Sequence, residues 1–364
     1  MPAIRFPGTD PRTLGLRILS VLLAIAAVWL AGCDQGVGQP TGAIHLPPKK
    51  TNTSQANILE YQIPAVDGLP NCLAFGSDGV LWITEQLTTQ YATDHARIGR
   101  LTPDGIYTTF PLPHTRTLYN PEDIALGSDG ALWFTEPQAD TIGRITSDGA
   151  IKEFRTPTPL SQPLGITAGP DGNLWFAEGL GDRIGSITPA GVIHEYPLPV
   201  SNSSPTAITV GPDGNLWFTL YSGDAIGRIT PAGVVTLFPI SQPMGKPWEI
   251  TAGPDGNLWF TQPSFNAIGR ITPTGDMTEF PLPRAGSSPD GITAGQDGAL
   301  WYAGQISNTI GRITPDGKIT EFELPLPRSG PLCVTPDKDG KIWFTESYGA
   351  IGYLAPKAGA ADRQ

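Results

Sequence analysis

The chain has 364 residues, 39% hydrophobic and 16% charged, which is enough apolar material for a large core and too little charge for a disordered protein. Its 34 acidic and 23 basic residues give a formal net charge of −11 at pH 7. Because Lys and Arg are scattered, no basic surface for phosphate is expected, which argues against a nucleic-acid partner.

The N-terminal segment has the pattern of an export signal. Three Arg residues precede a predominantly apolar run at residues 18–30, and small residues follow it. A helix of these 13 residues would span about 20 Å, which is short of the ~30 Å hydrocarbon core, so a permanent transmembrane helix is the weaker interpretation. We therefore assign residues 1–32 to a signal peptide.

The sequence Leu-Ala-Gly-Cys at residues 30–33 resembles the lipobox of bacterial lipoproteins. That resemblance implies a lipid on Cys33 and a bacterial membrane-anchored lipoprotein on the periplasmic or extracellular side. The alternative is an ordinary signal peptide with an incidental cysteine. Residues 33–57 are rich in Gly, Pro, Gln, Asn and Thr, so we expect a flexible tether without a fold.

A repeat of 42 residues determines the architecture. Seven Trp residues each close a Gly-rich segment, and after a first gap of 51 residues every gap is 42: Trp82, Trp133, Trp175, Trp217, Trp259, Trp301 and Trp343. Each unit holds four short β-branched or aromatic pieces separated by turn residues, which indicates four strands. We predict an all-β protein, a seven-bladed β-propeller with four antiparallel strands per blade at residues 58–355, and a disordered tail at 356–364.

Turn chemistry and ring closure follow from the repeat. Asp-Gly pairs mark hairpins on one face of the disc, so the variable loops between the second and third strands share the opposite face. Residues 58–64 match the outer-strand pattern of residues 319–325, whereas the seventh repeat ends without that strand. We therefore predict that the N-terminal strand 58–64 completes the last blade.

Two further cysteines, Cys72 and Cys333, follow the Pro that opens the inner strand in blades one and seven. Those blades are neighbours across the closure, so a disulfide would be geometrically feasible in an oxidising compartment. The alternative is that this position requires a small side chain, since Gly165, Ala207 and Gly291 occupy it elsewhere.

The repeats PxGITAGPDGNLWFTE and IGRITPDGxxTEFPLP resemble, over residues 58–355, those of the streptogramin B lyase family, also called virginiamycin B lyases. The resemblance implies ring opening of a cyclic depsipeptide lactone by elimination, with Mg²⁺ and a general base that removes a proton α to the ester carbonyl. It also implies catalytic groups on the variable face: a His directly after the opening Pro in each of the last two blades, and a nearby Glu.

The chain departs from the family at those positions. The residues after the opening Pro in the last two blades are Asp290 and Leu332. Leu accepts no proton, and an Asp with a pKa near 3.9 is a much poorer base than His. Glu346 lies close to the family's Glu, but structural repetition explains it, because three other blades hold Glu85, Glu136 and Glu178 in the same slot.

The variable face holds the candidate ligand-binding residues. Blade one has seven residues more than the other blades between its second and third strands, and this insertion carries Tyr91 and His95. The other candidates open the inner strands: Asn71, Glu122, Asp123, Trp248, Glu249 and Asp290. An aromatic platform among polar groups suits a small molecule, sugar or peptide, including a cationic one. The alternative is that Trp248 plugs the channel and the acids are solvated.

Two functions of different classes stay open. The first is a membrane-tethered extracytoplasmic module, a monomer, that binds a ligand or protein without a cofactor or metal. The second is an enzyme: a Mg²⁺-dependent virginiamycin B lyase-type C–O lyase or a lactonase-like enzyme, with Asp290, Glu249 or His95 as its base. The missing histidines favour the first.

Overall fold

The computed structural model describes residues 40, 42–53, 56–64, 68–87, 96–113, 120–240 and 244–356. The predicted signal peptide, Cys33, the blade-one insertion with Tyr91 and His95, and residues 357–364 lie outside this range. Within it, no helix is long and apolar enough to cross a membrane.

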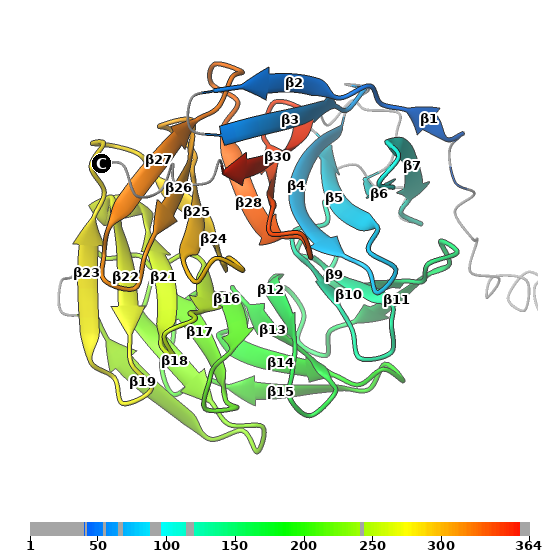
Figure 1. Ribbon diagram of the computed structural model, residues 1–364. Helices are drawn as coiled ribbons and strands as arrows, with labels where there is room; N and C mark the ends of the chain where they lie inside the picture. The colour runs from blue at the N-terminus through cyan, green and yellow to red at the C-terminus, as the bar shows by residue number, and fades with distance from the viewer. Residues whose placement is uncertain are drawn as a thin grey trace, which may run out of the picture. The chain divides into compact units, whose positions relative to one another are not determined.

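Seven antiparallel sheets form the predicted β-propeller (Figure 1). Blade one consists of β4 (Gly68–Phe75), β5 (Leu81–Leu87), β6 (Arg97–Leu101) and β7 (Ile106–Pro111). Blade two consists of β8 (Ile124–Leu126), β9 (Leu132–Glu136), β10 (Thr141–Ile145) and β11 (Ile151–Arg155). Blade three consists of β12 (Pro163–Ala168), β13 (Leu174–Glu178), β14 (Arg183–Ile187) and β15 (Ile193–Pro197). Blade four consists of β16 (Pro205–Val210), β17 (Leu216–Leu220), β18 (Ala225–Ile229) and β19 (Val235–Pro239).

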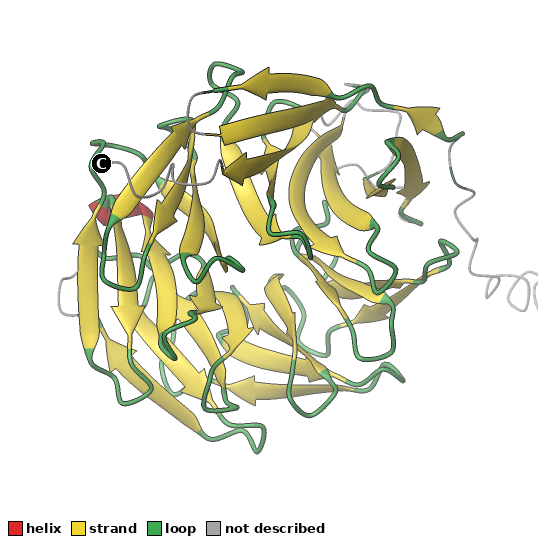
Figure 2. Ribbon diagram, viewed as in Figure 1, coloured by secondary structure: helices red, strands yellow, loops and turns green. Residues whose placement is uncertain are grey.

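The remaining blades repeat the pattern, and Figure 2 shows that strands dominate the described chain. Blade five consists of β20 (Ile250–Ala252), β21 (Leu258–Gln262), β22 (Ala267–Ile271) and β23 (Met277–Pro281), with the 3₁₀ turn η1 (Pro263–Phe265) between β21 and β22. Blade six consists of β24 (Pro289–Ala294), β25 (Leu300–Gly304), β26 (Thr309–Ile313) and β27 (Ile319–Glu323). Blade seven consists of β28 (Pro331–Pro336), β29 (Ile342–Glu346), β30 (Ala350–Pro356) and β3 (Ala56–Gln62).

The ring closes as the sequence predicts. Strand β3 pairs antiparallel with β30, with Ile58 opposite Leu354 and Tyr61 opposite Ile351. The first strand of the repeat domain is therefore the outer strand of the last blade. This pairing supplies β30 with the ladder partner that the end of the repeat lacks.

The flexible tether predicted at residues 33–57 is wrong for the part that the structure describes. Strand β2 (Lys49–Asn52) extends blade seven by pairing with β3, and β1 (Ile44–His45) extends blade one by pairing with β7. Leu46, between them, is 4% exposed and packs in the cluster that contains Tyr61. The physical reason is that β3 and β7 offer unpaired backbone edges, which a polar segment without helical pattern can still satisfy.

The Asp-Gly hairpin, the repeat Trp and the third strand form one recurring unit. In blade two, the Trp133 indole N–H donates to Asp129 at 3.1 Å, and Arg144 donates to the same carboxylate at 2.7 Å. The Arg144 guanidinium also covers the indole ring, 5.8 Å from its centroid. Arg144 therefore has a structural role within its own blade, and six of the seven repeat Trp side chains are at most 1% exposed.

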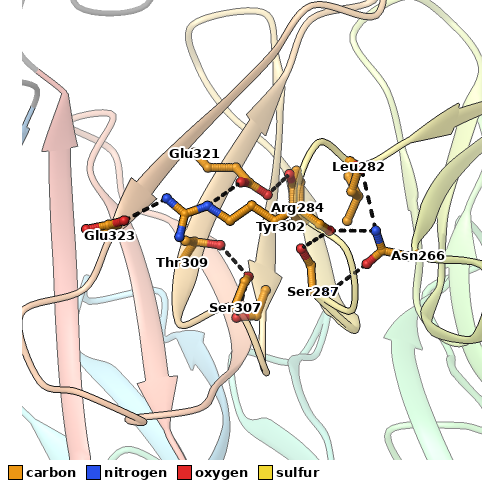
Figure 3. Close-up of polar contacts among 10 residues, drawn as sticks. Asn266, Leu282, Arg284, Ser287, Tyr302, Ser307, Thr309, Glu321 and Glu323 are labelled. Atoms are coloured by element: carbon orange, nitrogen blue, oxygen red, sulfur yellow. Dashed lines mark hydrogen bonds and ion pairs between the residues drawn. The ribbon is translucent and has the colours of Figure 1, made fainter.

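The loops that join blades clasp the outer strand of the next blade. Figure 3 shows Arg284, three residues beyond β23, between Glu321 and Glu323 of β27. Its nitrogens lie 3.1 Å from the Glu321 carboxylate and 2.7 Å from that of Glu323. At the equivalent loop position after β11, Thr158 donates its hydroxyl to Glu195 of β15 at 2.6 Å. These contacts connect blade five to blade six and blade two to blade three.

Candidate functional site

The inner strands surround an axial cavity of about 440 Å³. The residue after the opening Pro of every blade lines it: Asn71, Glu122, Leu164, Thr206, Trp248, Asp290 and Leu332. The sequence register therefore assigns these positions to one mouth correctly. Asp123 and Glu249 also line the cavity, as does Gln86 of β5, at the start of the segment that carries the blade-one insertion.

Glu346 does not belong to this lining. Its side chain is fully buried at the end of β29, where burial raises the pKa of the carboxyl to about 7 and the charge of Glu60 adds to the effect. Glu85 in the same slot of blade one pairs with Arg97 at 2.6 Å. This position at the end of the second strand is therefore buried within the blades. A structural role of this kind explains why Glu recurs there in several repeats.

Asp123 and Glu249 occupy the second position after the opening Pro, where the other five blades have a small residue. At Gly165 and Gly291, an added Cβ would lie 2.7 Å and 2.5 Å from a carbonyl oxygen of the next inner strand. An acidic side chain therefore fits only where the strand is opened. Strands β8 and β20, which follow the two acids, have three residues each, whereas β12, β16, β24 and β28 have six.

The Asp123 carboxylate connects its own strand to the next blade. The two oxygens accept hydrogen bonds from the backbone N–H groups of Ile124 and of Ile166 in the next blade, both at 2.8 Å. On the other side, Gln86 donates to the Glu122 carboxylate at 3.1 Å, and the Asn71 amide donates to the Glu122 carbonyl at 3.0 Å. The cavity wall between blades one and three is thus held by polar side chains.

Trp248 is fixed in orientation by three partners. Its indole N–H donates to Asp290 at 2.8 Å, and the hydroxyl of Thr219 donates to its carbonyl at 2.8 Å. The Tyr221 ring meets the indole edge to face, with centroids 5.5 Å apart. Because the side chain is half-buried and lines the cavity, the indole is an ordered aromatic wall beside a carboxylate.

Burial raises the pKa of all four cavity acids. The pKa of Asp123 rises to about 6, with the charge of Glu122 adding to desolvation. The pKa of Asp290 rises to about 7 through burial, although the Trp248 N–H opposes the shift. The pKa of Glu249 lies well above its usual value because of burial and the nearby Asp123 and Asp290. Burial also raises the pKa of Glu122.

The cavity lining holds four carboxyl side chains and, among the described residues, no Lys, Arg or His. Nothing basic in this lining compensates the acids, so a cation that enters relieves their mutual repulsion. No three Asp, Glu, His or Cys side chains of the described chain converge closely enough to hold a metal ion.

A disulfide joins Cys72 of β4 to Cys333 of β28, with the two Cα atoms 5.0 Å apart. It lies in the cavity wall and covalently connects the first and last blades. The alternative explanation, that this position requires a small side chain, is also supported. In the blades that have Gly there, the neighbouring inner strands approach closely.

The sequence and the fold both match known proteins. The Virginiamycin B lyase family matches residues 50–211 and 200–361. A virginiamycin B lyase of Nocardia farcinica (strain IFM 10152) is 30% identical over 116 residues, which is 32% of this chain and 35% of that protein, so the match spans about a third of this curated relative.

Solved structures cover nearly the whole propeller. A streptogramin B lyase structure superposes with a TM-score of 0.77 and 36% identity, over 83% of this chain and 98% of that one. Virginiamycin B lyase from Staphylococcus aureus has a TM-score of 0.76 and 40% identity, over 82% and 98%. A catalytically inactive His-to-Ala variant of the S. aureus enzyme with quinupristin has a TM-score of 0.76 and 39% identity, over 82% and 98%.

Proposed function

The chain belongs to the virginiamycin B lyase family, and from that premise we propose that it is a ligand-binding member whose axial cavity takes a small organic cation. The observation that carries the proposal is the cavity lining, with four acids and no basic side chain among the described residues. An ammonium or guanidinium group pairs with such carboxylates, and the Trp248 indole offers a cation–π contact beside Asp290.

The positions of the family's catalytic histidines support binding over lyase chemistry. They are Asp290 and Leu332 in this chain, and both line the cavity. A His-to-Ala variant of the S. aureus relative is catalytically inactive. Of the four histidines, His45 and His194 lie on β1 and β15 outside the cavity lining, and the other two lie outside the described residues.

Calorimetric titration tests the binding function. The probes are benzyltrimethylammonium and spermidine, with benzyl alcohol as the uncharged control. We expect saturable binding of the cations, with Trp248→Ala and Asp290→Asn each weakening affinity about tenfold or more. Tyr348→Ala is the matched control, since this aromatic side chain is 72% exposed and lies outside the cavity lining. Equal affinity in the wild type and Trp248→Ala would place the ligand elsewhere.

A second candidate function, ring opening by a carboxylate base, has one observation in its favour. The pKa of about 7 leaves Asp290 partly ionised at neutral pH and a stronger base than an ordinary Asp. Incubation with a streptogramin B and Mg²⁺ followed by mass spectrometry distinguishes the reactions, because elimination yields a linear isomer of unchanged mass whereas hydrolysis adds one water. Turnover that Asp290→Asn abolishes would replace the binding function. The described residues offer no Mg²⁺ site, so we assign no step to the metal.

We also propose that the protein is exported and lipidated on Cys33 and acts at a bacterial membrane surface. The support is the apolar run at residues 18–30 with the Leu-Ala-Gly-Cys sequence. Mass spectrometry of the N-terminal peptide from the membrane fraction should find diacylglycerol on Cys33. Cys33→Ser should remove that modification, and an unmodified, membrane-free wild type would contradict it.

A further inference from the structure

The junction of blades seven and one differs from the other junctions on the hairpin face. In five junctions, the hairpin glycine of one blade lies against the outer aromatic ring of the blade before it: an added Cβ at Gly149, Gly191, Gly233, Gly275 and Gly317 would lie 1.9–2.7 Å from that ring. The equivalent Gly105 meets Leu46 instead, which donates its backbone N–H to the Gly105 carbonyl at 2.9 Å. Leu46 therefore stands between Gly105 and the Tyr61 ring.

The repeat Trp of blade seven is covered by a Tyr ring, with centroids 4.9 Å apart, where five other blades use an Arg. Five blades place an Arg guanidinium 5.5–6.0 Å from the indole centroid, whereas Tyr353 stands at that register position opposite Trp343. The Trp343 N–H donates to Asp337, six residues earlier, and not to Asp339 at the usual distance of four. Trp343 is half-buried and contacts the rings of Tyr61, Phe75 and Tyr353, whereas the other six repeat Trp side chains are buried.

These changes open a cleft of about 720 Å³ between β4 and β28–β30, at the opposite end of the inner strands from the axial cavity. In Figure 1, these strands lie side by side at the closure of the ring. The cleft is lined by the half-buried rings of Phe75, Trp343 and Tyr353, which pack against one another, with Asp78, Asp339 and Lys338 exposed at its rim. It is a polar-rimmed aromatic cleft at the closure of the ring.

We propose that this cleft binds a neutral saccharide chain. Aromatic rings pack against the apolar C–H face of a pyranose, and rim carboxylates and ammonium groups hydrogen-bond its hydroxyls. The charge of the lining favours a neutral ligand, because the three Asp side chains face two Lys. Lys341 is already paired, 3.7 Å from Asp337 and 3.4 Å from Asp339, so the cleft offers neither sign of charge in large excess.

The test variant restores the contact between an Arg guanidinium and the repeat Trp that five other blades have. Tyr353→Arg recreates the guanidinium over the indole, with Asp339 available as its partner, as Asp129 is for Arg144. The matched control is Ser186→Arg, because blade three also lacks this Arg but has no part in the cleft. Ser77→Trp is a second blocking variant, since Ser77 is exposed on the cleft rim and filling the cleft from there leaves the core untouched.

The probes are tetra-N-acetylchitotetraose and cellotetraose, with the deacetylated tetramer and tetragalacturonate as charged analogues, titrated by calorimetry and Trp fluorescence. We expect at least one neutral tetramer to bind more tightly than its charged analogue, and Tyr353→Arg and Ser77→Trp to weaken it about tenfold while Ser186→Arg does not. Binding should survive Trp248→Ala, which separates this site from the axial cavity. No saturable binding up to about 10 mM, or equal binding in both blocking variants, would overturn the proposal.

Discussion

Two residue substitutions within the repeat create the chemistry of the axial cavity. Asp123 and Glu249 occupy a position that Gly165 and Gly291 show to be crowded by the next strand. The strands that follow them are short, and their carboxyls line a cavity to which Leu164 and Leu332 also contribute. Desolvation and mutual repulsion then raise the pKa of these acids.

Asp290 gives a prediction on stability and pH. Its pKa is raised from 3.8 to about 7, so the native state binds this proton more tightly than the unfolded chain, and the ionised side chain costs stability as pH rises from about 4 to about 7. Asp290→Asn, which stays neutral, should therefore raise the melting temperature relative to the wild type at pH 8, and the difference should vanish near pH 4.

The control is Asp148→Asn. The hydroxyl of Thr146 lowers the pKa of this exposed carboxyl, so the same substitution should give no gain at pH 8. Melting curves by circular dichroism from pH 4 to pH 8 check both variants. A pH-independent difference between Asp290→Asn and the wild type would show that ionisation of this side chain has no part in the effect.

The same pKa shifts predict how ligand affinity depends on pH. Asp123 and Asp290, with pKa values of about 6 and about 7, are largely protonated at pH 5 and ionised at pH 8. Affinity for benzyltrimethylammonium should therefore rise across this interval, and calorimetry at both values measures it. Affinity that is flat or falls with pH would exclude these carboxylates from the binding site.

At the element scale, β3 is the strand on which the last blade depends. Ile58 is 0% exposed, Tyr61 is 7% exposed and Ile63 beyond the strand is 1% exposed. At about 1.5–3 kcal/mol for each large buried apolar side chain, deletion of residues 58–64 should cost several kcal/mol and lower the melting temperature sharply. Deletion of residues 42–53, where Leu46 is the one buried hydrophobic side chain, is the matched control and should cost less. An unchanged melting curve for the first deletion would refute the closure.

The contact between Arg284 and the next blade should contribute far less to stability than β3 does. Arg284 is 45% exposed, and its contact with the 72% exposed Glu323 is a surface ion pair, whereas Glu321 is 6% exposed. We expect Arg284→Ala to cost about 1 kcal/mol in urea unfolding and Glu323→Ala to cost almost nothing. A larger loss of stability for Glu323→Ala than for Arg284→Ala would contradict this ranking. It would mean that the exposed contact with Glu323, and not the buried one, holds the loop.

At the scale of the whole molecule, the disulfide closes the ring a second time. Cys72 and Cys333 are separated by 261 residues, and the bridge adds a covalent link to the closure that β3 makes by hydrogen bonding. Cys72→Ala or Cys333→Ala should destabilise the propeller by about 2–5 kcal/mol, and dithiothreitol should lower the wild-type melting temperature to a similar extent. Two free thiols in the non-reduced protein, detected by mass spectrometry, would contradict the bridge.

The sequence by itself determined the propeller, its seven blades, the closing strand and the ring of positions at the cavity mouth. It could do so because each blade repeats one local pattern, and local turn and strand chemistry fixes which residue begins each inner strand. The family follows from the same repeats.

The features that depend on contacts between blades could be established only from the tertiary structure. The fold of residues 44–52, the exclusion of Glu346 from the cavity lining, the raised pKa of Asp290 and the cleft beside Trp343 all depend on neighbours that are distant in sequence. A repeat pattern describes the average blade, whereas burial, charge coupling and open space are set by how particular blades meet. The physical reason is that desolvation and packing are properties of contacts, and these contacts form only when the ring closes.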